Sequence, residues 1–157
     1  MNAIELWSEY LRTNPITDCE YTAWAFGCDA DLLAKLVVEG KKTATASAYD
    51  LYEPAAEPLP KEGSYSVILD SKEEAVCIIQ TTKVYVVPFC EVSASHAYKE
   101  GEGDQSLEFW RKVHRPFFSM GLMEIGIPFD ENRKVVCEEF KLVYPPAATN
   151  EISNPLK

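Results

Sequence analysis

The spacing of apolar residues predicts two helices within the first forty residues. Apolar side chains from Ile4 to Leu11 recur at helical intervals, and Asn14-Pro15 ends this pattern. Residues 15–28 contain three aromatic residues but show no period, so we expect an irregular segment. The second helix has an acidic cap, an apolar stripe and a glycine beyond its last turn. Its residues are Asp29 or Asp31, Leu32, Leu33, Leu36, Val37 and Gly40.

Strand patterns dominate the rest of the chain. Residues 65–69 and 75–87 are rich in β-favouring residues and are joined by a polar turn, and residues 134–144 form a third such run. Two further helices are predicted, a short one over residues 92–99 and a longer one that begins near Ser106. In the longer helix, Trp110, Val113, His114, Phe117 and Phe118 share one broad face, and Pro116 can kink it. Residues 50–64 contain prolines and a glycine and read as a long loop.

These elements of unequal length do not alternate as regular βαβ units. This arrangement favours the α+β class, with a largely antiparallel sheet or a small barrel. The length of 157 residues suits one domain, and a chain of this size can bury enough surface to fold without disulfides or metals.

The formal net charge of −10 argues against a protein that coats nucleic acid non-specifically, because that mode of binding needs dense positive charge. It leaves room for a small basic pocket. Five cysteines occur without a CxxC pair, the N-terminus lacks the apolar core of a signal peptide, and no apolar run approaches the length of a membrane span. We therefore expect a soluble cytosolic protein that has no contact with a membrane.

A run of small and hydroxyl residues follows the second helix. Alternation places Thr43, Thr45 and Ser47 on one face of a strand and alanines on the other. Together with Lys41 and Lys42, these hydroxyls form a donor-rich surface that suits a phosphate, a carbonyl or a developing oxyanion. An edge strand with β-favouring threonines and solvated lysines accounts for the same pattern.

The second candidate is the segment from His96 to Asp104, which ends in the acidic run Glu100-Gly101-Glu102-Gly103-Asp104. Neighbouring carboxylates repel one another, which raises the pKa of at least one of them and favours a basic partner. The glycines permit close approach of a ligand. The segment does not match the ligand pattern of an EF-hand, and a solvated acidic loop is the simpler interpretation.

The third candidate combines aromatic and basic residues in Trp110-Arg111-Lys112-Val113-His114-Arg115. Such a group can stack a base and hold a phosphate. Alternatively, the tryptophan and histidine face the core and the basic residues face solvent. The two histidines lack the spacing of a metal site and no GxSxG pattern is present, so we expect no metal and no cofactor.

Taken together, these segments resemble the ASCH domain family, which has a PUA-like fold of a small β-barrel with flanking helices. The family motif G-x-K-x-x-T-x-R is matched by Gly40, Lys42 and Thr45, with Ser47 in place of the usual arginine. The runs GKKTATAS and EGEGD resemble the signatures of a bacterial subfamily. The resemblance covers roughly residues 24–144. The predicted N-terminal helix and its lead-in, residues 1–23, precede this region, and the prolines from Pro145 onward predict a flexible tail at 145–157.

The resemblance implies a role in RNA or nucleoside chemistry. Some small bacterial ASCH proteins are amidohydrolases that remove the acetyl group of N4-acetylcytidine, and others are ribonucleases or proposed RNA-binding and coactivator modules. The amidohydrolase trio falls on Lys42, Thr45 and Glu100, the last through the pattern His96-Ala97-x-x-Glu100. We therefore expect a nucleoside, a nucleotide or RNA as partner, with a non-catalytic RNA-binding or adaptor module as the alternative.

The side chains of this trio have the chemistry that amide hydrolysis requires. Thr45 can act as a nucleophile if Lys42 takes its proton, and Glu100 can protonate the leaving amine if its pKa stays high. Lys42 and Thr45 would lie on opposite faces of a regular strand, so their convergence needs a turn or bulge at residues 41–43. Ser47 cannot hold a phosphate as an arginine does, so another cation reaches the site or the ligand differs. The remaining candidate ligand contacts are Gly40, Lys41, Thr43, Ser47, Glu102, Asp104, Trp110, Arg111 and His114.

Overall fold

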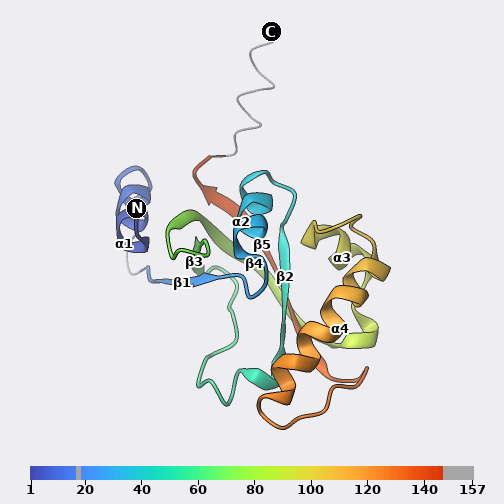
Figure 1. Ribbon diagram of the computed structural model, residues 1–157. Coiled ribbons are helices and arrows are strands. Elements are labelled where there is room, and N and C mark those ends of the chain that lie inside the picture. The colour runs from blue at the N-terminus through green and yellow to red at the C-terminus, as the bar shows by residue number, and fades with distance from the viewer. Residues whose placement is uncertain (17–18, 147–157) are drawn as a thin grey trace.

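Five strands in the order β1-β3-β4-β5-β2 form one curled sheet, a half-barrel flanked by four helices (Figure 1). The computed structural model describes residues 1–16 and 19–146. Neighbouring strands are antiparallel except β1 and β3, which are parallel. The predicted α+β class is confirmed. The strands are β1 Tyr21–Ala25, β2 Ala44–Ala48, β3 Tyr65–Leu69, β4 Ala75–Pro88 and β5 Lys134–Tyr144.

The helices begin at side-chain caps that satisfy their free N–H groups. Asn2 and Glu5 form a capping box at α1, and Ser93 and Ser106 cap α3 and α4. The predicted helices are all present within the described ranges. They are α1 Ala3–Thr13, α2 Ala30–Val38, α3 Ala94–Glu100 and α4 Leu107–Met123, with short 3₁₀ turns at Tyr49–Leu51 and Phe89–Glu91.

Two expectations about these elements are wrong. Residues 15–28, expected to be irregular, contain β1; this strand lies at the sheet edge and is largely exposed, so it lacks the alternation that marks a half-buried strand. In α4, the buried stripe runs through Trp110, His114 and Phe118, whereas Phe117 is 40% exposed. Helix α4 continues through Pro116.

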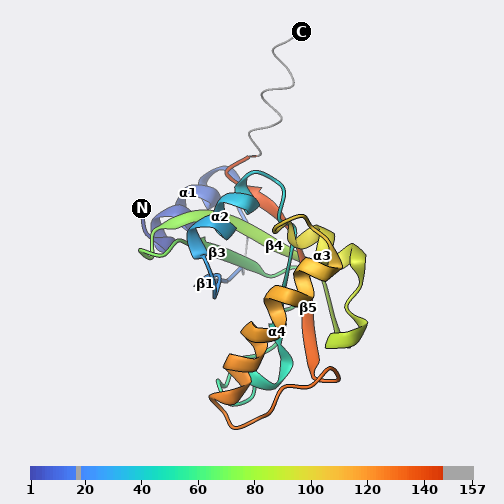
Figure 2. The same cartoon turned by 45° about the vertical axis from the view of Figure 1, so that its right-hand side comes forward.

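Helices cover the sheet on both faces. On the outer face, α1 packs over β3 and β4, whereas α3 and α4 pack over β2 and β5 at the other end of the sheet (Figures 1 and 2). On the inner face, α2 packs against Ile68, Ile79 and Phe140. Cys137 faces the α3–α4 pair and Phe140 faces α2, as the alternation of a strand requires.

Strand β2 presents two different faces. Ala46 and Ala48 pack on the outer face against the α3–α4 core, which leaves Thr45 and Ser47 on the inner face. None of the helices within residues 1–16 and 19–146 has the length and apolar character needed to cross a membrane. The expected tail at 145–157 lies outside the described residues from 147 onward.

Candidate functional site

The C-terminal end of α2 positions Lys42. Gly40 adopts a φ of 82° just after the helix, and the backbone N–H groups of Lys41 and Lys42 both donate to the carbonyl of Leu36, at 2.9 and 3.1 Å. The chain therefore turns sharply before β2 begins. The Lys42 side chain is 1% exposed, and its Nζ lies 5.2 Å from the ring centroid of Phe26. A solvated lysine, the simpler prediction from the sequence, is wrong at this position.

The C-terminal end of α3 positions Glu100. Gly101 ends the helix with a φ of 75°, and the N–H of Thr43 donates to the carbonyl of Lys99 at 2.7 Å. This bond ties the end of α3 to the residues that lead into β2. The Glu100 side chain is only 2% exposed, so the prediction of a fully solvated acidic loop is also wrong.

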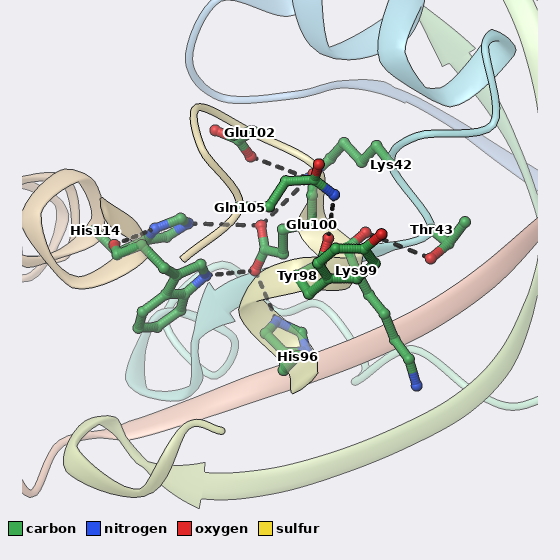
Figure 3. Close-up of polar contacts among 10 residues, drawn as sticks. Lys42, Thr43, His96, Tyr98, Lys99, Glu100, Glu102, Gln105 and His114 are labelled. Carbon is green, nitrogen blue, oxygen red and sulfur yellow. Dashed lines mark hydrogen bonds and ion pairs between the residues drawn. The ribbon is translucent and has the colours of Figure 1, made fainter. Parts of the chain in front are cut away.

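Lys42 and Glu100 form the centre of a buried polar network (Figure 3). Lys42 Nζ donates to Glu100 Oε1 and Glu102 Oε2, both at 3.2 Å, and lies 3.4 Å from the Glu100 carbonyl oxygen. Glu100 Oε2 accepts from His96 Nε2 at 2.7 Å and from Trp110 Nε1 at 2.8 Å. Every oxygen of this buried carboxylate therefore has a partner, which a buried charge requires.

The charge state of Glu100 follows from these contacts. Burial alone would raise its pKa, but the Lys42 ammonium, the hydrogen bond from His96 and the proximity of His114 together lower the pKa to about 2. Glu100 is therefore an anion at neutral pH. The expectation that its pKa stays high and that it protonates a leaving group is wrong, because the neighbours outweigh the cost of burial.

His114 supports the network from α4. Its Nδ1 donates to the Trp110 carbonyl at 2.9 Å, because a carbonyl can only accept, and its ring stacks on Trp110 at a centroid distance of 4.2 Å. Its Nε2 lies 3.7 Å from Glu100 Oε1. Helices α3 and α4 thus hold the carboxylate in one orientation.

Residues 22–144 match the family model described as ASCH domain. The chain belongs to the ASCH domain family. A crystal structure of an ASCH domain from Lactobacillus crispatus JV V101 is 32% identical, with a TM-score of 0.82 over 88% of this chain and 92% of that chain. A protein from Enterococcus faecalis V583 is 35% identical, with a TM-score of 0.83 over 90% of this chain and 88% of that chain. No functionally curated protein matches the sequence.

The ASCH fold brings some of the predicted site residues together and leaves others apart. Lys41 and Asp104 are exposed, and the Asp104 carboxylate accepts from the Ser106 N–H, with the Ser106 contacts lowering its pKa. Arg111 points to the Cys90 carbonyl, 3.4 Å away. The predicted residues that meet around the buried pair are Lys42, Glu100, Glu102, Trp110 and His114, with Thr43 bonded to the adjacent Lys99.

Thr45 and Ser47 occupy the inner face of β2. Thr45 lies directly opposite Glu138 of β5, and Ser47 Oγ lies 2.6 Å from Tyr52 Oη. Residues 41–43 precede β2, so the alternation of side chains between the two faces of that strand does not determine the direction of Lys42. No hydrogen bond in the described part of the chain joins Thr45 to Lys42 or Glu100. The structure thus brings Lys42 and Glu100 into contact and places Thr45, the third member of the trio, on the inner face of β2.

The sequence analysis names His96 only as part of the pattern that locates Glu100, and it does not name Glu138 at all. His96 lies four residues before Glu100 on α3, a spacing that places both side chains on one helix face. Glu138 is 8% exposed, its carboxylate accepts from Thr81 Oγ1 at 2.6 Å, and burial raises its pKa. Its signal was a single carboxylate between the apolar residues Val136 and Phe140 on the inner face of β5.

Proposed function

We propose that this ASCH protein binds a nucleoside, free or within RNA, between the lead-in to β2 and the loop after α3, and that it hydrolyses an amide on the base, as in N4-acetylcytidine. The observation that supports this proposal best is the buried Lys42–Glu100 pair, with side-chain exposures of 1% and 2%. A buried ion pair is a poor source of stability, and strongly perturbed carboxylates gather at functional sites.

The Lys42 ammonium is suited to the acyl oxygen of the substrate. Two of its three acceptors belong to Glu100, which is fixed by His96 and Trp110, whereas Glu102 is 20% exposed and belongs to the loop. A substrate oxygen that displaces Glu102 takes its place as an acceptor. Ionised Glu100 keeps the ammonium aimed at that oxygen, where negative charge develops during attack.

Thr45 supplies the nucleophile in this scheme. Its Oγ1 bonds to the acyl carbon, the C–N bond breaks, and the freed amine leaves. Lys42 gives a proton to the leaving nitrogen and receives the proton of Thr45, so its charge is unchanged over the step. Water then hydrolyses the Thr45 ester and releases acetate, which restores the hydroxyl.

Replacing the Thr45 hydroxyl tests this role. Thr45→Val is expected to slow acetate release from N4-acetylcytidine by about 100-fold or more, because the nucleophile is removed while the shape is kept, whereas Thr45→Ser retains most of the rate. Thr22→Val, at an exposed threonine of β1, is the matched control. The measurement is acetate release under saturating substrate. Equal rates for Thr45→Val and wild type contradict the assignment.

A second candidate function is RNA binding along α4. A surface hollow of about 560 Å³ lies there, and it has a basic rim. This supports contacts with phosphates, which need no catalytic group. The residues that line the hollow are Leu107, Glu108, Arg111, Lys112, Arg115 and Pro116.

If α4 binds RNA phosphates, Arg111→Ala/Lys112→Ala weakens binding of a short single-stranded RNA and flattens its salt dependence. The slope of log Kd against log salt is expected to fall by about 1 to 1.5, since each lost contact removes about 0.7. Arg133→Ala is the control, because Arg133 pairs with Asp50 and Asp130 at another hollow. Fluorescence anisotropy at several salt concentrations measures both quantities. An unchanged slope excludes this surface.

A further inference from the structure

The inner face of the half-barrel holds a second carboxylate that the proposed reaction does not use. Glu138 is 8% exposed and lies in the middle of β5. Thr81 donates to its Oε2 at 2.6 Å, and in the described part of the chain no other hydrogen bond and no ion pair reaches this side chain. Glu100 by contrast has a lysine, a histidine and a tryptophan around it.

A largely buried carboxylate with one hydroxyl partner has room for further donors, which solvent or a ligand can supply. Its Oε1 has no donor among the described residues. The residues around it leave access to this oxygen. Thr45, directly opposite on β2, and Ser47 beside it are only partly buried, so solvent reaches this face of the strand. A hydrogen-bond donor of a bound ligand would supply the partner that Glu138 Oε1 lacks.

We propose that Glu138 accepts an N–H group from the ligand and so selects a base with an amino or acylamino edge, such as a 4-amino or 4-acylaminopyrimidine. This inference rests on the proposed function and names the substrate class of that site. Acidic side chains read cytosine by accepting from its N4 amino group, and uracil presents an acceptor oxygen at the same position. A carboxylate therefore favours the first base and repels the second.

The position of Glu138 agrees with this role. It shares its strand face with Thr45, the proposed nucleophile, so a base whose N–H faces Glu138 has its acyl group next to Thr45. Ser47 and Tyr52, joined at 2.6 Å, extend the same face with hydroxyls. A surface of one carboxylate and neutral hydroxyls offers a phosphate no cation, which favours recognition of the base over its phosphate.

The test compares the affinities of cytidine and uridine for three proteins by isothermal titration calorimetry. Wild type is expected to bind cytidine about tenfold or more tightly than uridine. In Glu138→Gln the ratio falls towards one, because an amide can donate as well as accept. Glu139→Gln is the matched control. The Glu139 carboxylate pairs with Lys99, and the residue lies opposite the outward-facing Ala44, so the ratio of the cytidine and uridine affinities is expected to stay as in wild type.

Each outcome decides between the hypotheses. A Glu138→Gln ratio equal to that of wild type, or wild type that binds uridine as tightly as cytidine, overturns the role of Glu138 while acetate release still supports the proposed function. Wild type that binds neither nucleoside and releases no acetate overturns both. A cooperative thermal transition of Glu138→Gln well above the temperature of the titration shows that the variant is folded, since the amide oxygen can keep the Thr81 bond.

Discussion

Lys42→Met is expected to lower the free energy of unfolding by about 3–5 kcal/mol, because it leaves the Glu100 carboxylate buried without its cation. The side chains are 1% and 2% exposed, so solvent cannot replace the lost partner. Lys42→Met/Glu100→Gln is expected to recover most of this loss. In the double variant no charge remains at the centre, and the glutamine oxygen still accepts from Trp110.

Urea denaturation of wild type, both single variants and the double variant measures the coupling. An interaction energy of about 2–3 kcal/mol is expected for two residues in such direct contact. Additive losses in the double variant contradict the account, since they mean that the two groups stabilise the fold independently. The Lys35–Glu39 pair, with side-chain exposures of 71% and 49%, is the matched surface control and is expected to show little coupling.

The same variants give a pH dependence with a defined sign. The pKa of Glu100 falls from 4.5 to about 2 on folding, so its ionisation stabilises the protein above pH 4.5. This stabilisation is lost as the pH falls from about 4.5 towards 2. Glu100→Gln, which has no such group, is expected to show a shallower loss of stability over this interval.

Gly101→Ala is expected to destabilise the protein by about 3 kcal/mol or more, which for a chain of this size lowers the melting temperature by about 6–12 °C. Gly101 has a φ of 75°, and an added Cβ would lie 2.4 Å from the carbonyl oxygen of Lys41. Backbone atoms cannot move aside as a flexible side chain can. The displaced segment carries Lys42 itself, so the site is disturbed together with the fold.

Gly63→Ala separates the strain of a positive φ from the clash of the added Cβ with the backbone. Gly63 has a similar φ of 89°, but an added Cβ there meets nothing within 4 Å. It is expected to cost only the strain of the left-handed conformation, about 1–2 kcal/mol. Thermal unfolding of both variants measures the difference. Equal losses at the two positions contradict the close contact between the loop after α3 and the residues before β2.

Local patterns were enough to predict most of the elements. The helical stripe of α2, the capping serines of α3 and α4 and the polar turn between β3 and β4 are each readable within a short window of sequence. Strand β1 escaped prediction because its pairing partner β3 lies far along the chain and most of its residues are exposed. Its existence depends on a contact rather than on a pattern.

The site was only partly predictable for the same reason. Lys42 and Glu100 are 58 residues apart, and each stands in a charged stretch that suggests solvation. Their burial depends on α3 packing against the lead-in to β2. Family resemblance pointed to both residues, but the low pKa of Glu100 follows only from its neighbours in space. Glu138 has no motif, and its burial depends on the alternation of β5 within a folded sheet.

The most direct test of the account is the rate of acetate release from N4-acetylcytidine by Lys42→Met/Glu100→Gln, compared with wild type at equal concentrations of folded protein. The double variant is expected to fold, so a loss of rate reports on chemistry rather than stability. Wild type is expected to release acetate, and the double variant is expected to be slower by about 100-fold or more. A double variant as active as wild type, or a wild type that releases no acetate, would contradict the claim that the buried Lys42–Glu100 pair is the catalytic centre.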